Sequence, residues 1–320
     1  MTDDILYLSE ADVGDLEIDP AKSRNAILSA FREHHAGRIA SKPKLSLDLG
    51  PGHKFQSLCA ASAQSGLAVN KWLGVAPLEA SVSGRSVQAL VTLNDYGSGA
   101  PLCIMDGNVL TELRTAAMSA AMAEMIVTSE PRSIGFIGSG YQARSHLTAF
   151  LSLFPSLELA MVLSRTQASS ERFANWAQDG HGLRTQIPES AEDLVRQSSI
   201  LVTTVPMSAG LEPFLQPEWV APGAFVSAVD LARSWCPETL SEIEYLVTDD
   251  HVQEQESPTI SRLRGFDADL GDVASEAAEN LRQQDRRMFI FRGHATADLA
   301  IASEIYRDAL RATAGIRIPR

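Results

Sequence analysis

A glycine-rich turn between an apolar run and a helix-like segment constrains the fold of this chain most. Residues 133–137 form the β-type run SIGFI, and the next six residues read GSGYQA. This is the G-x-G-x-x-A form of a dinucleotide-binding turn. Gly138 permits the tight turn, Gly140 lets a pyrophosphate approach the backbone, and Ala143 allows close packing of helix on strand. The N–H groups at the start of the following helix, which we expect to end near Phe154, would face the phosphates.

The cofactor is therefore expected to contact the whole turn. The predicted contacts are Gly138, Ser139, Gly140, Tyr141, Gln142 and Ala143. A glycine-rich turn that holds no ligand is the alternative, and the position of this one between a strand and a helix argues against it.

The end of the next predicted strand bears on the choice of cofactor. Residues 159–163 read LAMVL, and Ser164, Arg165 and Thr166 follow. A site selective for NAD usually has a carboxylate here, which accepts a hydrogen bond from the ribose 2′-hydroxyl. Small hydroxyls and a guanidinium suit a 2′-phosphate instead. We therefore expect NADP(H) to be preferred and NAD(H) to remain possible; a surface arginine without a role in selectivity is the alternative.

Composition limits the class of protein. The 320 residues carry a net charge of −13, and their 45% hydrophobic content is ordinary for a globular protein. The sequence pI of about 5.0 argues against nucleic acid or an anionic membrane as partner. Cys59, Cys103 and Cys236 have no C-x-x-C spacing, which argues against a zinc site or a disulfide framework. Without a basic N-terminal region or a long apolar run, the sequence predicts a cytoplasmic protein with no membrane span.

The two halves of the chain differ in rhythm. Before residue 130, a helical segment at 20–37 precedes a series of short β-like runs, and a helix is expected over 110–127, with Thr111 as a possible cap. The β-like runs are residues 44–47, 54–59, 67–73, 87–94 and 102–105. From 131 to 293, apolar strands alternate with helices, which is typical of a doubly wound parallel sheet. A strong helical pattern over 295–314 follows.

Five segments in this order resemble the ornithine cyclodeaminase/μ-crystallin family. They are 110–117 (LTELRTAA), the turn 138–143, 202–204 (VTT), the strand that ends at Asp230, and 293–300 (GHATADLA). The resemblance covers nearly the whole chain. It implies an α/β protein in which a Rossmann-type doubly wound dinucleotide-binding domain is inserted into an α+β substrate and dimerisation domain. The expected bounds are 1–125 for the substrate and dimerisation domain, 126–294 for the Rossmann domain, and 295–320 for a C-terminal helix that returns to the first domain. The resemblance also implies a homodimer joined through the N-terminal sheets.

Four residues of the first half are assigned by this resemblance. Arg114 matches the family arginine associated with the substrate carboxylate, which a guanidinium grips with two parallel hydrogen bonds. A structural salt bridge is its alternative role. Thr115 is similar to a threonine that bonds the cofactor phosphates. Lys71 resembles a substrate-facing lysine with a possible proton-shuttling role, against a solvated strand lysine. Lys44 loosely matches a further basic residue for the same carboxylate, and an exposed lysine without a role in the site is an equal alternative.

Asp230 is the expected acid–base residue. It follows the apolar strand at 224–229, and open α/β sheets bind ligands at the carboxyl ends of their strands. The matching family aspartate is assigned to proton exchange at the substrate nitrogen; a helix N-cap is the alternative role. For Asp298, a cap or a buried hydrogen-bonding role is as plausible as a role in the site. The cofactor site is further predicted to include Thr203, Thr204, Val205 and Val229.

The chain departs from the family pattern in segments expected to border the substrate. Residues 58–60 read LCA where the family has M-P-A, and residues 230–238 read DLARSWCPE where the family has D-x-P-G-K-x-E. Trp235 is expected to add bulk in the second of these segments. The departures leave the side chain of the substrate open.

Two classes of function follow from these assignments. The first is NAD(P)H-dependent reduction of an imine beside a carboxylate, either a cyclic imino acid or an imine of a 2-oxo acid, or the reverse oxidation. Within this class, the NAD-dependent cyclodeamination of ornithine is disfavoured by Ser164-Arg165-Thr166, since such enzymes typically carry an aspartate there. The second class is a non-catalytic, μ-crystallin-like protein that binds NADP(H) and a ligand. The presence of Asp230, Lys71 and Arg114 favours the enzyme.

Overall fold

The computed structural model describes residues 4–50, 52–77, 80, 84–206, 211–256, 264–276 and 281–320. The chain divides into two compact units, which are described one at a time. Unit 1 comprises Met1–Met118 and Gly293–Arg320, and unit 2 comprises Ser119–Arg292. The first boundary lies inside one long helix, α3 (Gly107–Ile126).

Unit 1 is built on a mixed sheet with the strand order β16-β1-β7-β6-β5-β4-β2, and β3 pairs with β4. Its strands are β1 (Asp4–Leu8), β2 (Ile39–Ser41), β3 (Leu45–Gly50), β4 (His53–Ser62), β5 (Leu67–Val75), β6 (Val87–Asp95), β7 (Pro101–Asp106) and β16 (Ile316–Pro319). Its helices are α1 (Glu10–Asp15), α2 (Pro20–His35), the first part of α3, and α9 (Ala295–Ala312). The last helix and last strand of the chain thus belong to the same unit as the first.

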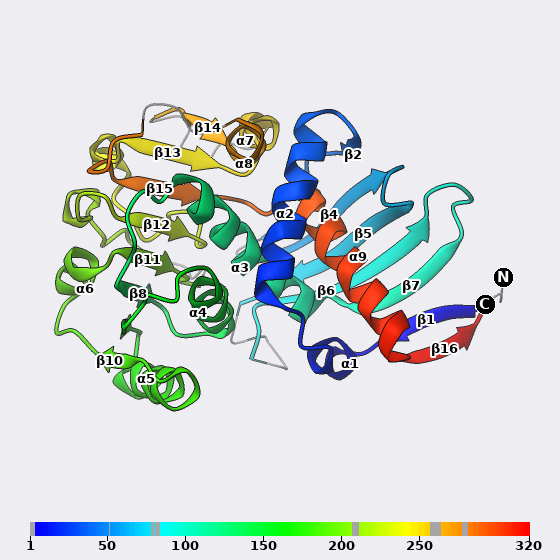
Figure 1. Cartoon of the computed structure of the whole chain (residues 1–320), viewed down its shortest axis with the longest axis horizontal. Helices are drawn as coiled ribbons and strands as arrows, with labels where there is room; N and C mark the ends of the chain where they lie inside the picture. Colours follow the sequence, from blue (N-terminus) through cyan, green and yellow to red (C-terminus); the bar gives the residue numbers. More distant parts are fainter. Residues whose placement is uncertain are drawn as a thin grey trace. The chain divides into compact units, whose positions relative to one another are not determined.

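One face of this sheet is covered by helices. α9 packs on β4 and β5, and α2 packs on α9, as Figure 1 shows with the two helices side by side. Side chains alternate between the faces of a strand, so Leu67, Val69, Lys71 and Leu73 of β5 all point to the covered face and are buried. A lysine therefore occupies a core position of the strand.

The predicted helices and β-like runs of unit 1 are confirmed, and the ends of the chain were not foreseen. β1 pairs in parallel with β7 and antiparallel with β16, a pairing that local sequence patterns do not reveal. The prediction of Thr111 as a helix cap is wrong. α3 already begins at Gly107, and the Thr111 hydroxyl donates to the Gly107 carbonyl at 2.6 Å.

Unit 2 is a doubly wound parallel sheet with the order β10-β9-β8-β11-β12-β15-β13-β14. Its strands are β8 (Ser133–Ile137), β9 (Leu159–Leu163), β10 (Arg184–Gln186), β11 (Ile200–Thr203), β12 (Phe225–Ala228), β13 (Tyr245–Thr248), β14 (Ala268–Asp269) and β15 (Arg287–Ile290). Its helical segments are the rest of α3, α4 (Tyr141–Leu153), α5 (Gln167–His181), α6 (Ala191–Gln197), the 3₁₀ turns η2 (Pro217–Trp219) and η3 (Pro237–Glu242), α7 (His251–Glu256) and α8 (Leu270–Ser275). The fold class predicted from the alternating pattern is confirmed.

All strands of this sheet run parallel, and β8 and β11 mark the point where the order of strand addition reverses: β9 and β10 lie on one side of β8, and β11 and β12 lie on the other. Ligands of open α/β sheets bind at such a switch point, outside the carboxyl ends of the strands. The glycine-rich turn follows β8, and Asp230 follows β12, the strand next to β11. Both predicted features therefore lie at the carboxyl edge of the same sheet.

Trp235 corrects one expectation. It was expected to add bulk beside the substrate, but its side chain is only 1% exposed and packs in the apolar core of unit 2 with Leu215, Val226 and Leu240. An indole buries more apolar area in a core than most side chains. Trp235 therefore supports the segment after Asp230 from inside the unit.

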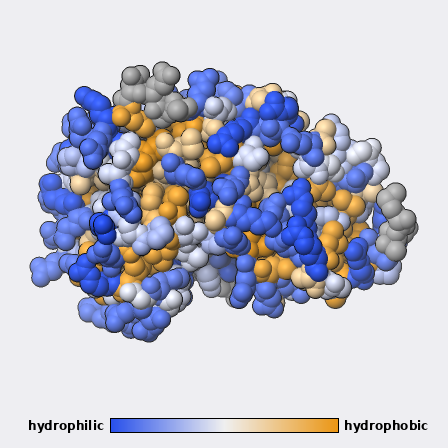
Figure 2. Space-filling view, viewed as in Figure 1, coloured by the Kyte–Doolittle hydropathy of each residue, from blue (hydrophilic) through white to orange (hydrophobic). Residues whose placement is uncertain are grey.

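No helix in the described part of the chain is long and apolar enough to cross a membrane. Figure 2 shows hydrophilic side chains spread over the visible face, with apolar ones between them.

Candidate functional site

The glycine turn after β8 has the geometry that a dinucleotide requires. Gly138 adopts φ +102°, and its N–H donates to the Leu163 carbonyl at 2.7 Å. A Cβ at this position would lie 2.5 Å from the Thr204 hydroxyl oxygen. Both the backbone conformation and the space therefore demand glycine at position 138.

The start of α4 is open to a ligand. Gly140 is its N-cap residue and provides no side-chain hydrogen bond, and a Cβ built on it would meet no atom within 4 Å. The first N–H groups of a helix have no partner inside the helix, and they carry partial positive charge. Ala143 is fully buried, as close packing of α4 on the sheet requires. These residues fit the pyrophosphate of a nicotinamide dinucleotide.

A buried hydrogen-bond chain fastens α4 to its neighbours within unit 2. His146 Nδ1 lies 2.7 Å from the Gln142 carbonyl, so Nδ1 carries the proton and donates. His146 Nε2 must then accept from the Ser119 hydroxyl at 2.9 Å. Since the single hydroxyl proton of Ser119 is already donated to His146, the Ser119 oxygen accepts a hydrogen bond from the Ser227 hydroxyl of β12 at 2.7 Å. Burial lowers the pKa of His146 to about 4, which keeps the ring neutral.

The end of β9 carries the three residues predicted to select the cofactor. The Ser164 hydroxyl donates to the Ser139 hydroxyl at 2.6 Å, so the β9 loop is tied to the glycine turn. Thr166 is the N-cap of α5 and accepts from the Ser169 N–H. Arg165 between them is exposed, and no residue in the described ranges makes a hydrogen bond or ion pair with its guanidinium. That side chain remains available for a ligand.

Asp230 is buried at the carboxyl edge of the sheet, with both carboxylate oxygens bonded. The Thr203 hydroxyl donates to Oδ1 at 2.9 Å, and the Ser234 hydroxyl donates to Oδ2 at 2.6 Å. Burial raises the pKa of Asp230, and the bonds from Ser234 and Thr203 and the charge of Arg233 oppose that rise. Residues 229–234 form turns, so the N-cap alternative for Asp230 is wrong.

The turn after Asp230 is strained. Leu231 and Ala232 adopt φ of 60° and 55°, in the left-handed region that residues with a Cβ disfavour. Strain of this kind persists where the surroundings hold the backbone, often at functional sites. Here it returns the chain so that Ser234 reaches the carboxylate four residues earlier.

Unit 1 holds a separate charged cluster. Lys71 Nζ donates to Asp298 Oδ1 at 2.5 Å, and both side chains are fully buried. Lys71 is therefore not a solvated strand lysine, and Asp298 is a buried bonding partner in the first turns of α9. Burial and the nearby Arg114 charge lower the pKa of Lys71 to about 8, although Asp298 opposes the shift.

Arg114 belongs to the same cluster, and its guanidinium has N–H groups that Asp298 does not use. Its Nε lies 3.4 Å from Asp298 Oδ1, and its Nη1 lies 3.9 Å from the Met118 sulfur. A Cβ at Gly293, which adopts φ +85°, would lie 2.3 Å from Nη1. The guanidinium thus packs against bare backbone. Its side chain is 9% exposed, so it forms part of a structural pair and still offers donors to a carboxylate.

The remaining predicted residues have less defined surroundings. Lys44 is partly buried just before β3. The Thr115 hydroxyl donates to the Thr111 carbonyl of its own helix at 2.6 Å. Thr204 donates to the Ile137 carbonyl at 3.4 Å, and Val205 is partly buried after β11. Tyr141 is half exposed, Gln142 and Val229 are partly buried, and Val229 directly precedes Asp230.

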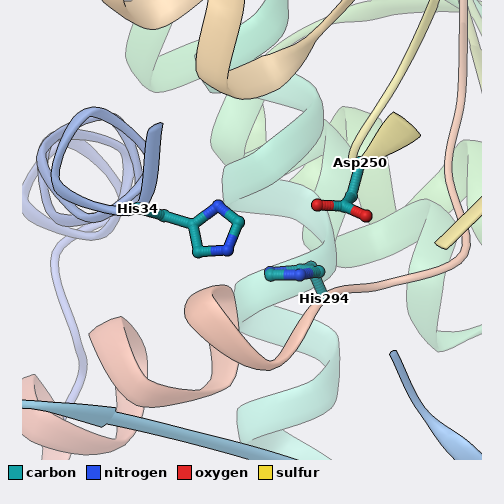
Figure 3. A group of neighbouring side chains, drawn as sticks. All are labelled: His34, Asp250 and His294. Carbon is teal, nitrogen blue, oxygen red and sulfur yellow. The ribbon is translucent and has the colours of Figure 1, made fainter. Parts of the chain in front are cut away.

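A histidine pair in unit 1 was not predicted. The ring centroids of His34 and His294 lie 4.7 Å apart in an edge-on arrangement, which can be followed in Figure 3. His294 is the N-cap of α9, accepting from the Thr296 N–H through its side chain. The pair joins α2 to the start of α9, the helix that carries Asp298.

Sequence reasoning also missed Ser119, His146, Ser227 and Ser234. Their roles depend on partners 27 and 108 positions away, or on a strained turn. Only the Gln142–His146 spacing of four residues is a local signal, because such residues are neighbours on a helix.

Known sequences and solved structures were compared with this chain, and they identify its family. A sequence model of the "Ornithine cyclodeaminase/mu-crystallin family" matches residues 5–313. The chain belongs to this family.

Individual family members are similar over most of their length. "Alanine dehydrogenase" of Archaeoglobus fulgidus is 29% identical over 326 residues, which cover 98% of each chain. "Ketimine reductase mu-crystallin" of Mus musculus is 31% identical over 226 residues, 69% of each chain. Among solved structures, an archaeal alanine dehydrogenase dimer with bound NAD has a TM-score of 0.87 at 25% identity, covering 98% of this chain and 99% of that one.

Proposed function

We propose that this chain is an NAD(P)H-dependent oxidoreductase that reduces an imine next to a carboxylate, or catalyses the reverse oxidation. The observation that carries the proposal is Asp230. A buried carboxylate is held by two hydroxyls at the carboxyl edge of a sheet whose glycine turn fits a dinucleotide. Relatives named ketimine reductase and Δ(1)-pyrroline-2-carboxylate reductase support the reaction class.

The cluster in unit 1 supplies the carboxylate-binding part of the proposal. Arg114 offers a guanidinium, and Lys71 adds a second positive charge that Asp298 balances. When Lys71 is protonated, the three side chains carry one net positive charge. This charge favours a substrate with a carboxylate beside the reacting carbon.

The chemical step needs a hydride at carbon and a proton at nitrogen. A bound nicotinamide dinucleotide supplies the hydride. Asp230 stabilises the protonated imine nitrogen, which is the better hydride acceptor, and exchanges the proton there. Arg114 and Lys71 orient the substrate through its carboxylate, and orientation of this kind lowers the barrier by removing freedom of motion before the reaction. The imine is a cyclic imino acid or an imine formed from a 2-oxo acid and an amine.

The preference for NADP(H) is a further part of the proposal. Arg165 is exposed beside the helix N-cap Thr166, and a guanidinium in this position suits a 2′-phosphate. β9 ends without a carboxylate that would bind a free 2′-hydroxyl. The same absence makes the NAD-dependent cyclodeaminase reaction the weaker alternative.

A homodimer in a reducing, cytoplasmic compartment completes the proposal. Five large apolar side chains share one face of the unit 1 sheet. Leu45, Trp72 and Leu90 lie in one row across β3, β5 and β6, and Leu47 and Phe55 form a neighbouring pair across β3 and β4. All five are at least 41% exposed. An exposed apolar patch of this kind marks an interaction site.

The oligomeric state tests this interface. Leu90→Glu should yield monomers in analytical ultracentrifugation. Leu310→Glu on α9, where the leucine is 43% exposed, should leave the dimer intact.

The deciding experiment is oxidation of NADPH and NADH with a panel of cyclic imino acids and pairs of 2-oxo acid and amine. Asp230→Asn should retain cofactor binding and lose about 10²–10⁴-fold in kcat, the usual worth of acid–base catalysis. Arg114→Ala should raise KM strongly with cofactor affinity nearly unchanged. Cofactor and substrate-analogue binding without turnover in the wild type would favour a binding protein instead.

A further inference from the structure

We propose that Thr203, Ser234 and Trp235 position the Asp230 carboxylate and set the pH range in which it exchanges protons. None of the three needs to touch the substrate. The proposal rests on the acid–base role of Asp230 proposed above, and it adds the residues that keep that carboxylate ready.

The three residues form a connected set beside Asp230, and the backbone N–H of Ala232 is a further donor to the carboxylate. Thr203 and Ser234 are fully buried, and each donates to a different carboxylate oxygen, at 2.9 and 2.6 Å. Trp235 is 1% exposed, and its Nε1 lies 3.4 Å from the Thr203 hydroxyl oxygen. Water therefore does not compete for these bonds, and buried bonds to a charged group are among the stronger ones in proteins.

The direction of each bond follows from the donors. An indole N–H can only donate, so the Thr203 oxygen accepts from Trp235. The single Thr203 proton is then directed to Asp230 Oδ1. Trp235 thus holds the rotor of Thr203 in the orientation that serves the carboxylate.

The set works against the cost of burial. Burial raises the pKa of Asp230, while Ser234, Thr203 and the backbone N–H of Ala232 lower it by stabilising the ionised form. Among the described residues, Arg233 is the charged group that acts on this carboxylate, and it also lowers the pKa. The balance leaves Asp230 able to release and recover a proton nearer to neutral pH than an exposed aspartate.

The backbone conformation after Asp230 brings Ser234 to the carboxylate. Leu231 and Ala232 accept a left-handed conformation in succession, and as a result Ser234 folds back onto Asp230. Trp235, next in the chain, is anchored in the core. Burial of Trp235 therefore holds the strained turn in the conformation that brings the Ser234 hydroxyl to the carboxylate.

The test compares Thr203→Val, which keeps the shape and removes the hydroxyl, with Thr203→Ser, which keeps the hydroxyl. Ser234→Ala and Trp235→Phe complete the set. Ser198→Ala is the control, because it removes a buried hydroxyl of the same unit whose hydrogen bond among the described residues goes to the Leu194 carbonyl, away from Asp230. The readouts are the kcat pH profile and the protonated-carboxyl band in infrared difference spectra, assigned by its loss in Asp230→Asn.

Loss of the hydroxyl at position 203 or 234 should move the Asp230 titration upward by about one to two pH units, the worth of a hydrogen bond to a charged group. Thr203→Ser should restore the wild-type titration, and Trp235→Phe should give a smaller upward move. KM should change little.

An unmoved titration in both Thr203→Val and Ser234→Ala, with a loss of stability like that of Ser198→Ala, would overturn the proposal. The infrared titration does not require turnover. If no imine is reduced, the proposed function fails while the positioning of Asp230 is still tested.

Discussion

Lys71 and Asp298 lie 227 positions apart in the sequence, yet Lys71 Nζ donates to Asp298 Oδ1 at 2.5 Å with both side chains fully buried. β5 provides the lysine and α9 the aspartate, so the pair joins the sheet of unit 1 to the helix that covers it. A buried charge is tolerated only when it is paired. The pair is therefore part of the core as well as of the charged cluster around Arg114.

Removal of one partner should destabilise unit 1 strongly. Asp298→Asn leaves the Lys71 and Arg114 charges together without a counter-ion, and we expect a loss of about 3–5 kcal/mol in the free energy of unfolding. Urea denaturation measures this loss. Glu158→Gln is the control, since Glu158 and Arg132 form an exposed pair for which exposure limits the loss to about 1 kcal/mol or less. Equal losses in the two variants would contradict the prediction.

Substrate binding should weaken as the pH rises through about 8, the pKa to which burial lowers Lys71. Below this value, Lys71, Arg114 and Asp298 carry one net positive charge, and above it they carry none. KM for a carboxylate substrate should therefore rise about tenfold or more across this range, the worth of a hydrogen bond to a charged group. Lys71→Arg stays charged, so it should lack this step; a step that persists would assign it to another group.

NADPH should bind more tightly than NADH, with Arg165 as the reason. Arg165→Ala should weaken NADPH binding about tenfold, a charge-assisted bond discounted for exposure, and leave NADH binding almost unchanged. Isothermal titration of both cofactors with both proteins measures this. Arg172→Ala, a change on the neighbouring helix α5, is the control. Equal losses for the two cofactors would remove Arg165 from the choice between them.

Acid should destabilise unit 2 through His146. Its pKa lies near 4 in the folded protein and at 6.5 without burial. Between these values the unfolded chain binds more protons, so stability is complete above pH 6.5 and is lost as the pH falls toward 4. The loss is about 3 kcal/mol at most. His146→Gln should flatten the pH dependence of the urea midpoint, whereas His35→Gln at the exposed end of α2 should not.

Local sequence patterns predicted the framework well. The run at 133–137, the glycine turn and the alternation of strands and helices in the second half predicted the parallel sheet, because these signals depend on neighbours a few residues apart. The same reasoning located Asp230 at the end of a strand. It did not predict the pairing of β1 with β16, which joins the two ends of the chain. It also placed Trp235 beside the substrate because of its position after Asp230, whereas the side chain packs in the core of unit 2.

The sequence by itself determined the family, the two kinds of architecture and the identity of the chemical groups, since composition and spacing are local properties of a chain. Only the tertiary structure decided how those groups are held. It paired Lys71 with Asp298, gave Asp230 its two hydroxyl donors, and kept His146 neutral. The physical reason is that burial and long-range hydrogen bonds set the charge state of a side chain, and both arise only when distant segments pack together.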